Sequence, residues 1–235
     1  MTAEEILHEL QLMGSEQTKK TWARHGAREP FFGVKVGDMK TLVKHIKKNH
    51  DLSLSLYETG NSDAMYLAGL IADEKKISKS DLQRWAENAP WYMISEYTVA
   101  WIAAESPHGW ELALEWIDSD RESVASSGWA TLSNLCLIRP DNQLDLEYLK
   151  KLLDRVAATL PQALNRVRYT MNGFVMACGI SVAPLHDYAI ETAEKVGEVH
   201  VNVGDTACQV PLAAKYIQNA EEKGKIGYKK KVARC

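Results

Sequence analysis

The sequence predicts an all-α protein built from stacked helix pairs, and three observations lead to this fold class. Apolar residues recur with the helical period, and strand-like alternation is nearly absent. Helix-start signals recur along the chain, separated by Asn or Gly breaks. Short helices rich in Ala, Gly and Ser also repeat at similar spacings, which favours an α-α superhelix (solenoid) over a plain helical bundle.

A basic amphipathic helix is the first clearly patterned element. Met39, Leu42, Val43 and Ile46 fall at positions i, i+3, i+4 and i+7, which places them on one face of a helix. The other side of this helix carries Lys40, Lys44, Lys47 and Lys48. We therefore expect basic helices within residues 1–50, at the start of the solenoid.

Helices of similar composition form the repeat. Each is dense in Ala, Gly, Ser and large apolar residues, and polar at its ends. They are expected at 64–74, 96–106, 127–137 and 169–179. Aligned on Ala68, Ala100, Ala130 and Gly173, they are separated by 32, 30 and 43 residues. This composition indicates inner helices of a solenoid.

More polar helices are expected between these inner helices, at 79–88, 110–118 and 145–159. The first of them has a clear start, because Ser78 and Asp81 form a capping box ahead of Leu82. The alternation of polar outer helices with inner helices predicts a single solenoid domain over residues 1–235, ending in a basic C-terminal tail at 222–235.

Composition is that of an ordinary globular protein, with 235 residues, 46% hydrophobic and 25% charged. The N-terminus lacks the features of a signal peptide, and no apolar run approaches the roughly 20 residues that span a bilayer. The cysteines Cys136, Cys178, Cys208 and Cys235 are scattered, and the histidines form no cluster. We expect a cytoplasmic protein with reduced thiols, no metal, no cofactor and no membrane association.

The net charge of −3 is unevenly distributed along the chain. Residues 19–48 carry nine bases and two acids, residues 215–235 carry seven bases and two acids, and residues 49–214 have a net charge of −11. Two basic ends could form one surface for a polyanion if the fold brings them together. The alternative is that they are solvated helix faces and, for the tail GKIGYKKKVARC, a frayed end.

The segment FFGVKVGDMKTLVKHIKK (31–48), followed by the inner helices in this order, resembles the DNA alkylation repair family, the AlkD-like HEAT-repeat DNA glycosylases. The resemblance covers about residues 5–220 and is most specific near the N-terminus. It implies a superhelix of HEAT-like helix pairs with a concave, cationic groove for duplex DNA. It also implies metal-independent excision of cationic N3- or N7-alkylated purines.

Excision of a cationic base can be achieved with a carboxylate and aromatic faces, which stabilise the oxocarbenium-like sugar and position the attacking water. The family places a Trp and an Asp four residues apart at the start of an inner helix. In the stretch WYMISEY, Trp91 matches this Trp, but Ser95 stands four residues later and Glu96 follows it. Since one residue turns a helix by about 100°, Glu96 replaces the acid only if the backbone is shifted there.

The family's later positions, an Arg on the next inner helix and a second Trp on a later one, are matched less closely. The next inner helix offers Trp129 but no Arg, and Phe174 stands in place of the second Trp. The candidate catalytic residues are therefore Trp91, Glu96, Trp129 and Phe174. The candidate DNA contacts are Lys19, Lys20, Arg24, Lys44, Lys47, Lys48, Arg166, Arg168, Lys229, Lys230 and Lys231.

Most of these residues also have a purely structural interpretation. Trp91 could anchor the core, Ser95 could be a helix N-cap with Glu96 in the first turn, and Trp129 and Phe174 could be core residues. Arg166 and Arg168 point to different helix faces, so at most one is expected to face the groove. The loop-like stretch VNVGDTACQVP (201–211) suggests no mechanism, and Cys208 has no nearby His that would activate it.

Three function classes follow. The first is a DNA glycosylase with a variant aromatic cage, which would release 7-methylguanine from duplex DNA. The second is a noncatalytic DNA- or RNA-binding solenoid, whose affinity would fall steeply with salt concentration. The third is a protein-binding scaffold, which would bind no nucleic acid even at low salt.

Overall fold

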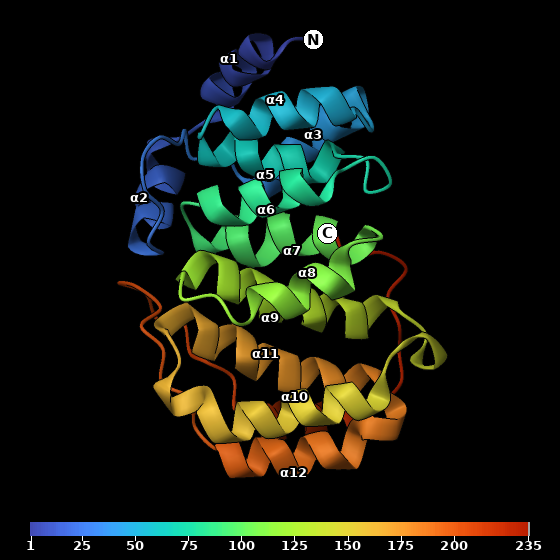
Figure 1. Cartoon of the computed structure of the whole chain (residues 1–235). Coiled ribbons are helices and arrows are strands. Elements are labelled where there is room, and N and C mark those ends of the chain that lie inside the picture. Colours follow the sequence, from blue (N-terminus) through green and yellow to red (C-terminus); the bar gives the residue numbers. More distant parts are fainter. Residues whose placement is uncertain (235) are drawn as a thin grey trace.

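The computed structural model describes residues 1–234, in which all regular structure is helical (Figure 1). Three N-terminal helices come first, followed by helix pairs that stack in chain order. The N-terminal helices are α1 (Ala3–Met13), α2 (Glu16–Arg24) and α3 (Val36–Ile46). The pairs are α4 (His50–Glu58) with α5 (Ser62–Ile71), α6 (Lys79–Asn88) with the π-helix η1 (Met93–Val99) and α7 (Ala100–Glu105), α8 (Gly109–Trp116) with α9 (Glu122–Ile138), α10 (Leu146–Thr159) with α11 (Asn165–Ser181), and α12 (His186–Val196) with α13 (Ala213–Glu222). Short 3-10 segments connect some of them: η2 (Asp141–Gln143), η3 (Leu160–Gln162) and η4 (Ala183–Leu185).

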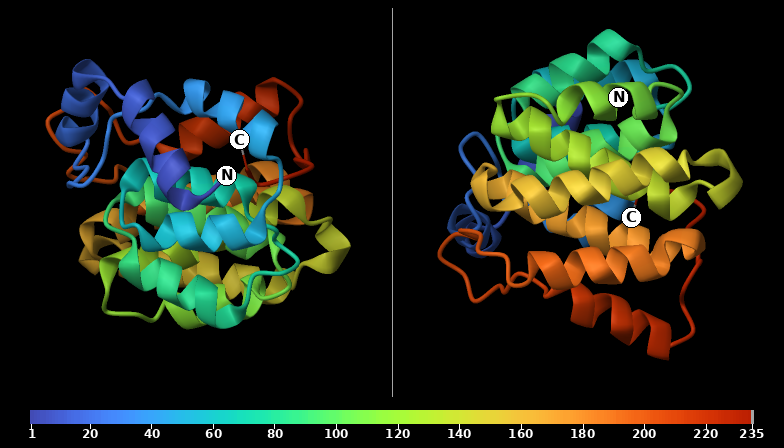
Figure 2. Two further views of the ribbon diagram at one scale, coloured as in Figure 1. Left: turned by 90° about the horizontal axis from the view of Figure 1, so that it is seen from above. Right: turned by 60° about the horizontal axis from the view of Figure 1, so that its bottom comes forward.

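The pairs form two layers, which Figure 2 shows from above. The outer layer consists of the first helix of each pair. The inner layer consists of α5, η1 with α7, α9 and α11, against which α1 and α3 pack at one end and α13 at the other. This architecture confirms the predicted all-α solenoid of helix pairs.

Small residues allow the helices to approach closely. A Cβ atom on Gly69 of α5 would lie 2.6 Å from Cγ2 of Thr98, and one on Gly128 of α9 would lie 2.8 Å from the backbone nitrogen of Ile117. Both distances are shorter than a van der Waals contact, so a side chain at either position would push the helices apart. The small residues that mark the repeat in the sequence thus serve helix packing.

The predicted outer helices agree well with the structure. Ser78 Oγ accepts a hydrogen bond from the backbone N–H of Asp81 over 3.0 Å, which confirms the capping box, and α6 begins and ends where predicted. The inner helices α9 and α11 begin earlier than predicted, at Glu122 and Asn165. Their first turns are polar and precede the apolar run on which the prediction was based, so the prediction began too late.

The inner helices all run in the same direction. Their first turns therefore lie along one edge of the solenoid, the N-terminal edge, and their last turns along the opposite edge, the C-terminal edge (left and right in Figure 1). At the N-terminal edge, Asp63 at the start of α5 accepts backbone N–H groups from Phe32 over 2.5 Å, Gly33 over 3.2 Å and Val34 over 2.8 Å. The FFGV segment, on which the family resemblance rests, is fixed to the inner layer in this way.

The basic C-terminal tail runs along the C-terminal edge and satisfies the last carbonyl groups of the inner helices. Gly227 N–H donates to Ile180 of α11 over 2.8 Å, and Lys229 Nζ donates to Cys136 of α9 over 2.8 Å. Lys230 N–H donates to Leu137 over 2.8 Å. Such groups have no partner within their own helix, and cations are favoured at that helix end. The alternative of a frayed tail is therefore wrong for residues up to 234.

Arg234 completes this tail as the centre of an ion-pair cluster. Its guanidinium lies 2.6 Å from Glu105 and 2.5 Å from Glu74, and it donates to the carbonyl of Ala72, at the end of α5, over 2.9 Å. Arg234 and Glu105 are only 12% and 8% exposed. Burial alone would raise the pKa of Glu74, but Lys48 and Arg234 hold it at about 2.

The described cysteines carry no disulfide. Cys136 and Cys178 are buried with their Sγ atoms 3.7 Å apart, Cys208 is exposed, and Cys235 lies outside the described residues. Within residues 1–234, no helix alone has the length and hydrophobicity of a membrane span; α11 with the segment Ala183–Val196 reaches those limits only as a pair bent by 115°.

Replacing Arg234 by Ala is expected to lower the free energy of unfolding by about 3 kcal/mol, because the buried carboxylate of Glu105 loses its partner. Urea denaturation followed by circular dichroism measures this change. Lys231→Ala is the matched control, since that side chain is exposed and forms no ion pair; it should change stability by less than about 0.5 kcal/mol. Equal effects of the two substitutions would show that Arg234 does not hold the C-terminal edge together.

Candidate nucleic-acid interface

A pocket of about 350 Å³ opens at the N-terminal edge, between the first turns of η1, α9 and α11. Trp91 and Tyr92 line it at the start of η1, and Arg166 lines it from α11. Its rim includes Arg28, which follows α2, and the loop backbone at 202–204. We call it the edge pocket. Helix first turns carry unpaired N–H groups and a positive partial charge, to which Arg28 and Arg166 add, whereas the carboxylate of Glu122 also lines the pocket.

The segment Met93–Val99 is a π-helix, which accounts for the displaced acid of WYMISEY. A π turn accommodates an extra residue compared with an α turn, so the side chains within it change their angular position. The backbone shift that Glu96 needs to replace the family's acid is therefore present. The N-cap interpretation of Ser95 is wrong, because Ser95 lies inside this helix and is buried.

Both carboxylate oxygens of Glu96 accept hydrogen bonds from Arg166, over 2.7 Å from Nε and 2.5 Å from Nη2. The guanidinium itself lies between the rings of Tyr92 and Tyr169, 4.2 and 4.3 Å from their centroids. The side chain of Glu96 is only 4% exposed and does not line the edge pocket. Arg166 thus separates the acid from anything that the pocket holds.

Burial raises the pKa of the Glu96 carboxyl to about 7, against the opposing effect of Arg166 and with a smaller contribution from the charge of Glu122. Glu122 Oε1 also accepts the backbone N–H of Arg166 over 2.9 Å, at the start of α11. The pKa of Arg166 is itself raised, because pairing with Glu96 outweighs the burial that would lower it. The site holds a buried acid whose charge depends on pH near neutrality.

Trp91 forms one wall of the edge pocket and also anchors an aromatic cluster. Its Nε1 donates to the carbonyl of His25 over 2.8 Å, and its ring lies 5.1 Å from that of Trp22 and 5.2 Å from that of Tyr92. Only 7% of Trp91 is exposed. The structural interpretation of this residue holds, because its main contacts join the end of α2 to the start of η1.

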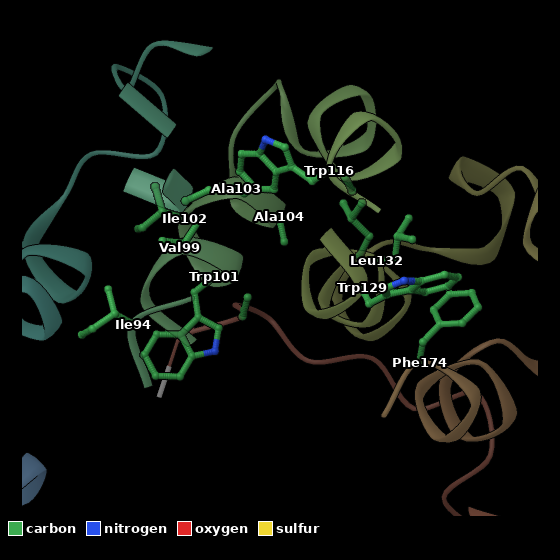
Figure 3. Packing of buried hydrophobic residues seen from close by; sticks show 14 of the residues in the cluster. Ile94, Val99, Trp101, Ile102, Ala103, Ala104, Trp116, Trp129, Leu132 and Phe174 are labelled. Atoms are coloured by element: carbon green, nitrogen blue, oxygen red, sulfur yellow. The ribbon is translucent and has the colours of Figure 1, made fainter. Parts of the chain in front are cut away.

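Trp129 and Phe174 do not form the aromatic cage that the sequence suggested. They are 1% and 0% exposed, with ring centroids 5.3 Å apart, and they pack against each other between α9 and α11 (Figure 3). Neither lines the edge pocket. Since both rings are enclosed by other core side chains, neither can stack on a nucleotide.

The stretch 201–211 covers part of the N-terminal edge. Asn165 Nδ2 donates to the carbonyl of Asn202 over 2.9 Å, and the N–H of Asn202 donates back to Asn165 Oδ1 over 2.7 Å. Asp205 N–H donates to the carbonyl of Arg24 over 2.9 Å. Gly204 has a φ of +86°, and a Cβ atom there would collide with that carbonyl. This loop therefore fastens α11 to the end of α2.

The predicted DNA contacts are distributed over several surfaces. Lys20 and Arg24 are exposed on α2, Lys44 is exposed on α3, and Lys47 is exposed just after α3. Lys19 is paired with Glu29, and Lys48 with Glu74. Lys229 is bound to Asp141, and the segment Lys229–Lys231 lies at the C-terminal edge. Glu74 accepts hydrogen bonds from both Lys48 and Arg234, so the tail and the end of the N-terminal basic segment lie beside each other at this edge. Their role in DNA binding stays a prediction. The prediction also missed Arg28 on the pocket rim, since no periodic pattern marks it.

The raised pKa of Glu96 predicts that stability depends on pH. Below about 4.5 the carboxyl is protonated in both the folded and the unfolded protein, and between 4.5 and about 7 only the folded protein keeps the proton. Rising pH therefore favours unfolding in this interval and has no further effect above it. Relative to Glu96→Gln, which cannot ionise, the wild type should lose about 3 kcal/mol of unfolding free energy across the interval. Urea denaturation at several pH values measures this, and a pH-independent difference between the two proteins would contradict the raised pKa.

Comparisons with known proteins agree with this fold. A family model described as DNA alkylation repair enzyme matches residues 6–217. Uncharacterised proteins of Listeria monocytogenes and Listeria innocua are 35% and 34% identical over 231 and 229 residues, which cover 96% and 95% of this chain and 100% and 99% of theirs. A solved structure is 39% identical with a TM-score of 0.92 over 100% of both chains, and it is described as a new family of proteins related to the HEAT-like repeat DNA glycosylases with affinity for branched DNA structures. The chain belongs to the DNA alkylation repair enzyme family.

Proposed function

We propose that this protein binds DNA along its N-terminal edge, prefers branched DNA to linear duplex, and does not excise bases. The observation that carries the proposal is the buried Glu96–Arg166 ion pair beneath the edge pocket. The preference for branched DNA follows the described affinity of the similar structure.

The ion pair argues against the excision chemistry that the family resemblance implies. Stabilising an oxocarbenium-like sugar needs a carboxylate directed at the sugar and aromatic faces around it. Here Arg166 occupies both oxygens of Glu96, and Trp129 and Phe174 are enclosed in the core. Of the four candidate catalytic residues, only Trp91 lines the pocket.

The exposed charge at the N-terminal edge supports DNA binding. Arg24 and Arg28 are exposed and form no ion pair, and Lys20 is likewise exposed on α2. Contacts to phosphates account for most of the salt-dependent affinity of DNA-binding proteins. The end of α2 and the 201–211 loop meet beside the pocket. Together they form a ridge flanked by cations, along which the diverging strands of a DNA branch can bind.

A four-way junction should bind with a Kd about tenfold lower than a linear duplex of the same strand length, a difference of about 1.4 kcal/mol. Methylated duplex DNA incubated with the protein should release no more 3-methyladenine or 7-methylguanine than a protein-free control. Release that disappears in Glu96→Gln would instead establish a glycosylase. Equal affinity for junction and duplex would contradict the branch preference, and no binding at low salt would point to a protein-binding scaffold.

Arg28→Gln should weaken junction binding about fivefold and reduce the salt dependence of log K by about 0.9, the value for one phosphate contact. Lys75→Gln is the matched control, because Lys75 is exposed, forms no ion pair and follows α5 at the C-terminal edge. It should change the affinity by less than about twofold. A stronger effect of Lys75→Gln than of Arg28→Gln would mean that DNA binds at the C-terminal edge, which would contradict this proposal.

A further inference from the structure

A second, larger hollow lies beside the edge pocket, with a volume of about 660 Å³. Asn165 and Asn202 line both cavities, so the hydrogen-bonded pair of these residues stands between them. The second hollow is also lined by Arg168 from the first turn of α11 and by His200 and Gln209 from the loop between α12 and α13. We call it the Arg168 hollow.

Arg168 has no partner for its guanidinium. Its Nε atom is shut off from solvent without a hydrogen-bond acceptor, and within residues 1–234 it is the one arginine with such an atom. The other arginines with strongly shielded side chains are paired, Arg166 with Glu96 and Arg234 with Glu74 and Glu105. A shielded donor without an acceptor costs free energy, and its persistence needs an explanation.

The place of Arg168 in its helix makes the cost larger. A cation in the first turn of a helix is opposed by the partial positive charge of that end, and the first turn of α11 contains no acidic residue. Glu96 and Glu122 offset the charge of Arg166 there. Glu198 lines the same hollow as Arg168 but forms no ion pair with it. No side-chain interaction within the folded protein therefore explains why an arginine occupies this position.

We propose that Arg168 binds a phosphate group of a nucleic-acid ligand in this hollow. A planar guanidinium with free donors matches two phosphate oxygens, and a phosphate there would also interact favourably with the start of α11. The hollow is larger than a phosphate and has the volume of sites that hold a nucleotide. The proposal rests on the proposed function, since a DNA strand on the N-terminal edge passes both cavities.

The phosphate can belong to the DNA backbone or to a 5′ end, and one experiment distinguishes them. Junctions with 5′-hydroxyl or 5′-phosphate ends are titrated with wild type and Arg168→Gln at several salt concentrations. The substitution should weaken binding about tenfold and reduce the salt slope by about 0.9. Loss with both junctions identifies a backbone phosphate, and loss only with the phosphorylated junction identifies a terminal one. Unchanged affinity and slope for both junctions would overturn the proposal.

Arg139→Gln is the matched control for this substitution. Arg139 is also half-buried, lines a cavity and forms no ion pair, but it lies at the end of α9, on the C-terminal edge. It should change the affinity by less than about twofold. Because Arg168 makes no side-chain bond to the protein and its shielded donor costs free energy, Arg168→Gln should not lower the thermal unfolding midpoint below that of the wild type. Arg168→Lys, which keeps the charge but loses the planar donors, should retain the salt slope with weakened binding.

A second titration separates this site from the proposed function. Deoxyadenosine monophosphate is added to the full-length protein while the arginine side-chain N–H signals are followed by NMR. A shift of the Arg168 Nε–H signal in the wild type, with no binding by Arg168→Gln, supports the site even if no DNA binds. A different outcome is that DNA binds while Arg168→Gln changes the affinity neither for the monophosphate nor for the two junctions. That result would contradict the Arg168 site and leave the proposed function intact.

Discussion

The structure depends on how the ends of its parallel inner helices are satisfied. Every helix leaves unpaired N–H groups at its start and unpaired carbonyl groups at its end. Because α5, η1 with α7, α9 and α11 run the same way, these groups collect on two opposite edges (Figure 1). Irregular segments from both ends of the chain bind them. On one edge the carbonyl of Pro30 accepts the N–H of Ser62 at the start of α5, and the FFGV segment that follows Pro30 donates its own N–H groups to the Asp63 side chain. On the other edge the tail from Gly227 to Arg234 donates to the last carbonyls.

This division gives the two edges different chemistry. On the C-terminal edge Lys229 and Arg234 of the tail have carbonyl groups and acids as partners, whereas the side chains of Lys230 and Lys231 are exposed. On the N-terminal edge the first turns of η1, α9 and α11 surround a pocket, with Arg28 on its rim and Arg168 in the neighbouring hollow. Positive charge that can attract a polyanion therefore lies beside the pocket on that edge. Beneath it, Arg166 holds the acid that excision would need.

The sequence predicted the fold because the helical period and the spacing of small residues depend on local packing. It also singled out Trp91, which lines the edge pocket, and stated the backbone shift as a condition for Glu96, but it did not predict the π-helix. It could not place Trp129 and Phe174, because the inner helices are apolar on several faces and the period alone does not say which face meets a groove. It could not show the role of the tail either, since the bond from Lys229 to Cys136 joins residues 93 positions apart. The pairing of Arg166 with Glu96 spans 70 positions and was equally out of reach.

Hydrogen–deuterium exchange of the protein with and without a four-way junction tests the central claim most directly, because it reports both edges in one measurement. The account predicts that DNA slows exchange in peptides covering residues 24–34, 90–97 and 199–210, and leaves residues 225–234 and the last turns of α5 and α9 unchanged. Slower exchange confined to the tail and the C-terminal edge would contradict it.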